Sequence, residues 1–441
     1  MILPEAVQFC IRVLEEAGYS AYAVGGCVRD ALLGLTPHDY DLCTDATPEK
    51  TACLFSGFSL VRSGEKHGTI GVVMDSQVIE ITTFRTEGGY QDSRHPDWVR
   101  FVDNLEEDLA RRDFTVNAMA YSPKSGYRDP FGGQQDLQNR VLRAVGDPAA
   151  RFMEDPLRIL RGVRFAVRFG LCPEPETEQA MTTLAPLMDK LAKERVLDEL
   201  CKLLPRITAP DLLRFAPILT AVIPELAPSV GFLQHNPHHA YDVFTHIAHV
   251  TAAVPAVPAL RWAALLHDVG KPAAFTMDAQ GQGYFKGHAA LGADMADAIL
   301  RRLKAPTGLR EQVVFLVGHH MTPLDPDKRL LRRRLGQYGE QTVRDLLALQ
   351  RADYSSKGTG VLQESDTFDQ TEALLNQILE EDACFTVRDL AIDGRDLLAL
   401  GFAPGPKLGA CLDELLQQVQ DEVLPNEKEP LLQAAEDYLM Q

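Results

Sequence analysis

The chain is 441 residues long and carries 44 Lys and Arg against 62 Asp and Glu, a formal net charge of −18. Hydrophobic residues make up 45% and charged residues 24%, which is typical of folded globular domains and excludes a disordered or fibrous chain. No run approaches about 18 consecutive apolar residues, and the first residues lack a basic signal region, so we expect no membrane partner and no secretory signal. Eight cysteines without a CxxC pair argue against a zinc ribbon or a disulfide-linked partner and favour the cytoplasm.

The pattern of apolar residues changes along the chain from mixed to helical. Residues 1–19 have helical spacing, and AYAVGG at 21–26 predicts a strand that ends in a glycine pair. Residues 40–121 contain short β-rich runs such as GTIGVVM and QVIEITTF, and the pattern is helical from residue 151 almost to the end. This order predicts an α+β head, a small mixed sheet with helices, followed by an elongated all-α body.

Charge is distributed unevenly. Residues 352–441 hold 19 acidic and 5 basic residues, whereas residues 301–351 hold 11 basic and 5 acidic residues. The basic part includes the cluster Lys328, Arg329, Arg332, Arg333 and Arg334. The overall acidity therefore does not exclude nucleic acid, because local patches neutralise phosphates. A phosphate-binding patch and a solvated helix face both remain open for this cluster.

The glycine pair Gly25-Gly26 lies between an expected strand and an expected helix. Glycines let backbone N–H groups approach an anion closely, and Arg29 adds a possible charge-assisted contact. A plain strand-to-helix turn is the alternative.

Three carboxylates in the head suggest a metal site. Asp39 and Asp41 in HDYDL are two residues apart, and a strand places such residues on the same face. Two Mg²⁺ ions about 3.5–4 Å apart are the usual partners of such a pair in phosphoryl transfer. Glu80, which interrupts the apolar strand QVIEITTF, is the expected third catalytic carboxylate. A turn or cap for the aspartates and an exposed strand position for Glu80 are the alternatives.

Five ordered motifs carry a family resemblance. They are GGCVRDALLG at 25–34, HDYDL at 38–42, RRDFTVNAMA at 111–120, DPFGGQQDL at 129–137 and EDPLRILRGVRFA at 154–166. Together they resemble the class II tRNA nucleotidyltransferases, which comprise the CCA-adding enzymes and the related bacterial poly(A) polymerases. The resemblance implies addition of C, C and A from CTP and ATP to the tRNA 3′ end, with two Mg²⁺ ions held by Asp39 and Asp41.

The resemblance also implies a set of nucleotide-binding residues: Gly25, Gly26, Arg29, Arg111, Arg112, Asp113, Asn117, Asp155, Arg158, Arg161 and Arg164. The resemblance implies that Asp155 and Arg158 read the incoming base, which agrees with residues i and i+3 sharing a helix face. A simple Asp–Arg helix pair is the alternative. A carboxylate accepts from the exocyclic amine of C and A, whereas U and G present a carbonyl there. The stretch at 87–102 matches the loop that accompanies switching from C to A addition in this family.

A second constellation of histidines and aspartates lies in the helical body. It comprises His246, His267-Asp268 in ALLHDVGKP, His288, His319-His320 and Asp353, a mixed N/O donor set. This pattern resembles the HD phosphohydrolase superfamily. The resemblance implies His246, His267, Asp268 and Asp353 as ligands of Mg²⁺, Mn²⁺, Ni²⁺ or Fe²⁺, and His288, His319 or His320 as ligands of a second metal. Lys271 would contact phosphate or cap a helix, and a helical scaffold without turnover is the alternative.

We therefore expect four domains: a nucleotidyltransferase head at 1–138, nucleotide-selecting and RNA-binding neck helices at 139–206, a body with the HD site at 207–356, and a tRNA-contacting helical tail at 357–441. RNA contact is expected mainly from 158–206 and 301–351. Three other functions stay open: a poly(A) polymerase or A-adding-only enzyme, an HD phosphohydrolase whose head binds RNA, and a non-catalytic tRNA-binding protein.

Overall fold

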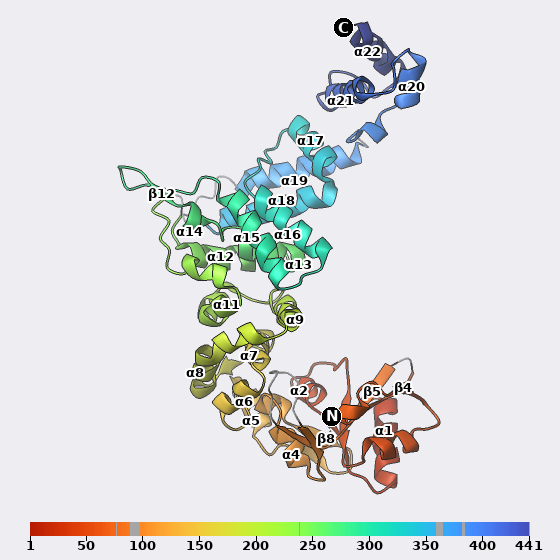
Figure 1. The fold of residues 1–441 in the computed structure, drawn as a ribbon, viewed down its shortest axis with the longest axis vertical. Helices are drawn as coiled ribbons and strands as arrows, with labels where there is room; N and C mark the ends of the chain where they lie inside the picture. The colour runs from red at the N-terminus through yellow and green to blue at the C-terminus, as the bar shows by residue number, and fades with distance from the viewer. Residues whose placement is uncertain (76, 89–97, 238, 359–364, 382–383, 441) are drawn as a thin grey trace. The chain divides into compact units, whose positions relative to one another are not determined.

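A computed structural model of the chain describes residues 1–75, 77–88, 98–237, 239–358, 365–381 and 384–440 (Figure 1). The chain divides into two compact units. The first comprises Met1–Ala227 with Arg302–Lys304, and the second comprises Pro228–Arg301 with Ala305–Gln441. No helix in these described ranges combines the length and apolar character needed to cross a bilayer.

The first unit is built on a seven-stranded sheet with the order β3-β4-β5-β2-β1-β8-β9. The strands are β1 (Ala21–Val24), β2 (Asp41–Thr44), β3 (Ser59–Val61), β4 (Thr69–Met74), β5 (Gln77–Thr83), β8 (Ala120–Ser122) and β9 (Gly126–Arg128). Neighbours are antiparallel except β2 and β5, which run parallel. The expected mixed sheet is thus confirmed.

Helices and a hairpin complete the head. They are α1 (Glu5–Glu16), α2 (Gly26–Leu32), α3 (Pro48–Leu54), α4 (Leu105–Ala110), α5 (Gly133–Gln138), and the antiparallel pair β6 (Arg85–Gly88) and β7 (Trp98–Phe101). Helix α1 buries Val7, Cys10, Ile11 and Leu14, because residues spaced three, four and seven apart form one apolar face. The loop expected at 87–102 lies mostly outside the described residues.

The neck helices continue the first unit: α6 (Pro148–Glu154), α7 (Leu157–Phe169), α8 (Pro175–Leu184), α9 (Lys193–Leu203), α10 (Ala209–Arg214) and α11 (Ala216–Val222). The parallel pair β10 (Val141–Leu142) and β11 (Cys172–Pro173) lies beside them. The chain leaves the helical conformation at Asp155, with φ −141° and ψ 99°. Proline disfavours the helical conformation in the residue before it, so Pro156 separates α6 from α7.

The second unit is helical, as predicted, apart from the short antiparallel pair β12 (Thr276–Met277) and β13 (Gly283–Tyr284). Its helices are α12 (Val243–Ala253), α13 (Pro258–Leu266), α14 (Lys271–Ala274), α15 (His288–Arg302), α16 (Thr307–His319), α17 (Lys328–Tyr338), α18 (Glu340–Ser355), α19 (Ser365–Glu380), α20 (Gly394–Ala399), α21 (Pro406–Gln420) and α22 (Lys428–Met440). The last three helices share their own apolar core around Leu397, Leu415 and Leu431.

The basic cluster of α17 is paired with acidic residues of the same unit. Lys328 lies 2.9 Å from Glu381, Arg332 lies 2.7 Å from Glu422, and Arg333 lies 2.6 Å from Asp421. These three cations are therefore neutralised internally, which favours the solvated helix face over a phosphate-binding patch.

Candidate functional site

Acidic side chains meet at the parallel strands β2 and β5. Asp41 is the first residue of β2 and lies opposite Glu80 of β5 in the register of the pair. Desolvation raises the pKa of Asp41, Arg112 opposes this, and the negative charges of Glu80 and Asp39 add to it. The expectation that Asp39 shares the strand is wrong, because β2 begins only at Asp41. The mutual repulsion of these carboxylates is what a divalent cation relieves, and their oxygens are the ligands that Mg²⁺ prefers.

A cavity of about 440 Å³ lies beside Asp41 and gathers the whole expected nucleotide-binding set. Its walls include Gly25, Gly26, Arg29, Arg111, Arg112, Asp113, Asn117, Asp155, Arg158, Arg161 and Arg164. Arg168, Arg195, Leu157 and Phe165, which we did not predict, also line it. Eight arginines against three aspartates make the cavity suited to a polyanion such as a triphosphate.

Gly25 is favoured by its backbone conformation. Its φ is +78°, and a Cβ at this position would lie 2.8 Å from Nη1 of Arg112. A side chain here would be strained by the positive φ and would also displace the end of the Arg112 side chain, so glycine suits this position.

A chain of buried polar contacts holds the cavity wall. Arg29 donates to Asp30 at 2.6 Å and to Asn117 at 2.5 Å, and Asn117 donates to Asp113 at 2.9 Å. Asp113 also accepts both Nε and Nη2 of Arg161, at 2.9 and 2.7 Å. Arg29, Asp113 and Asn117 thus hold one another and Arg161 in place, in addition to lining the cavity.

The carboxylate of Asp113 is stabilised in its charged form. Burial alone would raise its pKa, but the Arg161 guanidinium and the Asn117 amide hold that pKa well below its ordinary value. A carboxyl whose pKa is depressed by folding stabilises the folded state above its unfolded pKa of about 3.9, and this contribution is lost as the pH falls.

Asp113→Asn is therefore expected to lower the free energy of unfolding by about 2 kcal/mol at pH 7, a value reduced for the 35% exposure of the Arg161 side chain. Urea denaturation from pH 7 to pH 3 should show the difference between wild type and variant shrinking below about pH 4. A difference independent of pH would contradict the ionic role.

Asp108 is a buried residue that sequence reasoning missed. It lies 2.8 Å from Arg111 and 3.5 Å from Arg112, and it is fully shielded from solvent. Burial raises its pKa, but the two guanidinium groups outweigh burial and hold the pKa below its ordinary value. The spacing i, i+3 and i+4 in EEDLARRD was the available signal.

Asp155 and Arg158 both line the cavity, but not as one helix face. Asp155 lies between α6 and α7, where its Oδ1 accepts from the backbone N–H of Leu157 at 3.0 Å and its Oδ2 accepts from Arg195 at 2.9 Å. Arg158 donates to Glu154 at 2.7 Å and to backbone carbonyls of Arg151 and Arg111. The expectation of a shared helix face is wrong because Pro156 breaks the helix between them.

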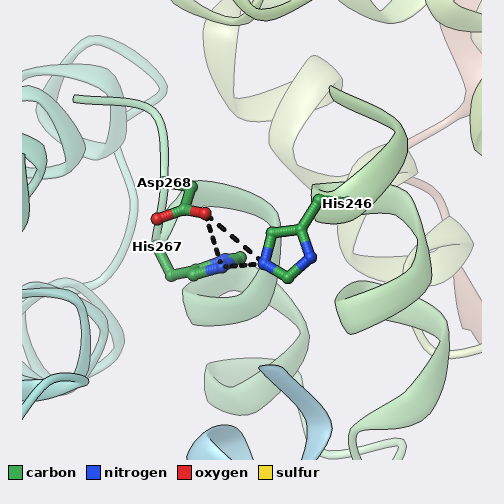
Figure 2. Close-up of side chains that lie close together, drawn as sticks. All are labelled: His246, His267 and Asp268. Carbon is green, nitrogen blue, oxygen red and sulfur yellow. Dashed lines mark hydrogen bonds and ion pairs between the residues drawn. The ribbon is translucent and has the colours of Figure 1, made fainter. Parts of the chain in front are cut away.

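In the second unit, His246, His267 and Asp268 converge from α12 and the end of α13 (Figure 2). The Nε2 atoms of the two histidines are 3.4 Å apart, and Oδ2 of Asp268 lies 3.5 and 3.2 Å from them. Asp353 of α18 lies 2.9 Å from Nε2 of His246. Burial lowers the pKa of His267, but Asp268 outweighs it and holds that pKa above its ordinary value.

A second group of ligand atoms shares Asp268. His288 and His320 place their Nε2 atoms 3.4 and 3.9 Å from its Oδ1, and 3.2 Å from each other. Among the described residues, the two groups of three ligand atoms within 4.8 Å of one another are this triad and the one above. Lys271, expected to contact phosphate or cap a helix, lies 2.6 Å from Asp268.

His319 does not belong to either triad. Its ring stacks on Phe315 with centroids 4.0 Å apart, and its Nδ1 faces the backbone carbonyl of Phe315 at 2.9 Å. The expectation of His319 as a metal ligand is therefore wrong for this arrangement, because adjacent residues at a helix end point in different directions.

Backbone carbonyls fix the orientation of the four converging imidazoles. The Nδ1 atoms of His246, His267, His288 and His320 lie 3.3, 2.8, 2.7 and 2.7 Å from the carbonyls of Ser356, Ala264, Phe285 and Val317. A carbonyl only accepts, so this contact favours the proton on Nδ1 and leaves a lone pair on each Nε2. The Nε2 lone pairs of His246 and His267 then face each other, as do those of His288 and His320. A cation between the two nitrogens of each pair would remove the repulsion. The donor set thus fits a divalent metal.

His239 also belongs to the surroundings of this cluster and was missed. Its ring lies 5.3 Å from that of His246 in an edge-to-face arrangement, and its buried Nδ1 has no partner among the described residues. Burial lowers its pKa to about 3. The run HNPHHAYDVFTHIAHV offered several histidines without a pattern to single it out.

Three family models match the chain. A poly(A) polymerase head domain matches residues 21–143, a probable RNA and SrmB-binding site of polymerase A matches 170–229, and a putative tRNA nucleotidyltransferase domain 2 matches 287–435. The CCA-adding enzyme of Streptococcus gordonii is 34% identical over 434 residues, which cover 97% of both chains. That of Levilactobacillus brevis is 34% identical over 445 residues, or 99% of both chains.

Solved structures agree with these relatives. The CCA-adding enzyme of Bacillus stearothermophilus in complex with CTP is 28% identical, with a TM-score of 0.74 over 100% of this chain and 98% of that chain. The acidic strand ends, the arginine-lined cavity and the matched head domain define a nucleotidyltransferase whose head is similar to that of poly(A) polymerases. Because its relatives match along almost their entire length, the chain belongs to the family of CCA-adding enzymes.

Proposed function

We propose that this chain adds C, C and A from CTP and ATP to the 3′ end of tRNA. The observation that carries the proposal is the single cavity beside Asp41 that gathers all eleven expected nucleotide-binding residues. The relatives named CCA-adding enzymes, and the similar structure that holds CTP, support the same conclusion.

The reaction is attack by the RNA 3′-hydroxyl on the α-phosphate of the nucleotide, with pyrophosphate as the leaving group. Asp39, Asp41 and Glu80 would hold two Mg²⁺ ions, which supply a lowered hydroxyl pKa and charge neutralisation of the triphosphate. The arginines of the cavity bind and orient the phosphates through charge-assisted hydrogen bonds. Asp155 and Arg158 read the base edge that distinguishes C and A from U and G.

Product length on a tRNA that lacks its last three nucleotides tests this function. We expect two additions with CTP alone, and a third only when ATP is also supplied. Long A tails would identify a poly(A) polymerase, and A addition only to a CC-ending tRNA would identify an A-adding enzyme. No addition at all would leave a tRNA-binding protein or a hydrolase.

The four expected domains stay a proposal within this function. We place nucleotide selection and RNA contact in the neck, which overlaps the matched RNA-binding region at 170–229. The paired state of Lys328, Arg332 and Arg333 gives the cluster at 301–351 less weight as an RNA contact than expected. Eight free cysteines support the cytoplasm as its location.

We also propose a second activity, metal-dependent hydrolysis of a phosphate ester in the second unit. Two triads that share Asp268 would hold a pair of metals, with Asp353 as a further ligand. Imidazole nitrogens suit Mn²⁺, Fe²⁺ or Ni²⁺ better than Mg²⁺, which prefers oxygen ligands. A cavity of about 550 Å³ reaches His320 and Asp353 and offers room for a small substrate.

A further inference from the structure

The side chain of Asp155 is held by one local and one distant hydrogen bond. The residue lies in an extended conformation between two helices, so no helix face fixes its rotamer. Its Oδ1 is held by the backbone N–H of Leu157, two residues further on. Its Oδ2 accepts from Nη2 of Arg195 at 2.9 Å, a residue 40 positions away in sequence. Leu157 thus holds one oxygen of the carboxylate, and Arg195 holds the other.

Arg195 is itself placed by a rigid helix. It lies in the first turn of α9. This helix is packed into the core through Val196 and Leu200, which are 1% and 0% exposed. Glu199, one turn later, accepts from Nε of Arg164 of α7 at 2.6 Å. Helix α9 is thus fixed against α7 on the side that carries the cavity. A pair that is only 24% and 17% exposed is partly shielded from water, which strengthens its hydrogen bond.

The guanidinium of Arg195 also has one N–H donor group that makes no hydrogen bond within the described part of the chain. Its Nη1 is buried and has no hydrogen-bond partner in the described part of the chain, although the side chain lines the nucleotide cavity. A buried donor without a partner costs free energy unless a ligand completes it. Arg158, in contrast, has both terminal nitrogens bound to Glu154 and to backbone carbonyls.

We propose that Arg195 is a positioning residue for base selection. It holds the carboxylate of Asp155 so that this group accepts a hydrogen bond from the amino group of C or A. U and G present a carbonyl at that place, and a carbonyl and a carboxylate, which both only accept, repel each other. The inference rests on the proposed nucleotide addition and deepens it. Without Arg195, only the backbone N–H of Leu157 restrains the Asp155 carboxylate, and the rejection of U and G weakens.

The test measures kcat/KM for CTP, ATP, UTP and GTP. Each nucleotide is supplied singly, with tRNAs that lack the last three, two or one nucleotides of the 3′ end. We expect Arg195→Ala to lower discrimination against UTP and GTP roughly 10- to 100-fold, the worth of one charge-assisted hydrogen bond. Arg195→Lys keeps the positive charge but lacks the planar guanidinium group, so it should lose less of the discrimination against UTP and GTP. Lys202→Ala is the matched control, because Lys202 of the same helix pairs with Asp198 on the exposed surface.

A double variant separates positioning from binding. If Arg195 acts through Asp155, then adding Arg195→Ala to Asp155→Asn changes discrimination no further. An equal loss of addition for all four nucleotides, with discrimination intact, would overturn the inference and leave Arg195 as a phosphate or structural residue. Arg195→Lys carries the test if Arg195→Ala does not fold. A wild-type protein that adds neither C nor A would instead refute the proposed function, and the inference with it.

Discussion

Asp41→Asn is expected to reduce the addition of both CMP and AMP by roughly 10³-fold or more, because the neutral amide removes the one of the three expected catalytic carboxylates that lines the arginine-lined cavity. The loss should appear in kcat rather than in nucleotide affinity, since the arginines that bind the triphosphate are unchanged. Product formation from labelled CTP and ATP in single turnovers measures it. Excess Mg²⁺ should restore little of the rate.

Folding should survive this change. Asp41 faces the charges of Glu80 and Asp39, so replacing it with a neutral group relieves repulsion and should leave the thermal unfolding temperature unchanged or slightly raised. Asp75→Asn is the matched control: it removes a carboxylate from the turn that follows β4, and Asn tolerates the φ of +48° found there. Activity of Asp41→Asn within tenfold of wild type would rule out Asp41 as a metal ligand.

Asp268→Asn is expected to empty the metal centre of the second unit completely, because both triads depend on this one carboxylate. Wild-type protein loaded with Mn²⁺ and dialysed should retain about two ions per chain by elemental analysis, and Asp268→Asn should retain none. His288→Ala removes a ligand of only one triad and should retain about one ion. Hydrolysis of p-nitrophenyl phosphate should fall with the metal in both variants.

His319→Ala is the matched control for this experiment. It removes an imidazole adjacent in sequence to His320, but one that stacks on Phe315 outside both triads, so metal content should stay at the wild-type value. His288→Ala also guards against misfolding of Asp268→Asn, in which the buried Lys271 loses its partner. Nucleotide addition should be unchanged in all three variants. Equal metal content in all of them would refute the metal centre.

The residues that sequence reasoning found share a property with one another. Asp41 and Arg112 belong to short motifs in which several functional residues stand close together, so the chain itself displays their association. Arg195 stands 40 residues from Asp155, and only the packing of α9 against α7 brings the two together. His239 similarly meets His246 through a loop whose path the sequence does not encode as a repeating pattern.

Local backbone chemistry explains the errors. The spacing of Asp155 and Arg158 suggested a continuous helix, but Pro156 between them disfavours the helical conformation at Asp155. The spacing of Asp39 and Asp41 suggested one strand, whereas the strand starts at the second aspartate. For the basic cluster of α17, the sequence left a phosphate-binding patch and a solvated helix face open, because its acidic partners, Glu381, Asp421 and Glu422, lie far away in sequence.

His267 and His320 share an arrangement that ties the second site to the length of its helices. Each is the residue that ends its helix, α13 or α16, and each turns Nδ1 toward a carbonyl three residues earlier. These carbonyls belong to the last turn, which has no later N–H groups of its own helix to bind. One residue more or less would rotate such an end by about 100°. The number of residues in each helix therefore sets the orientation of its imidazole. Substitutions on the outer faces of these helices should leave that orientation intact, whereas a single insertion or deletion within either helix should destroy it.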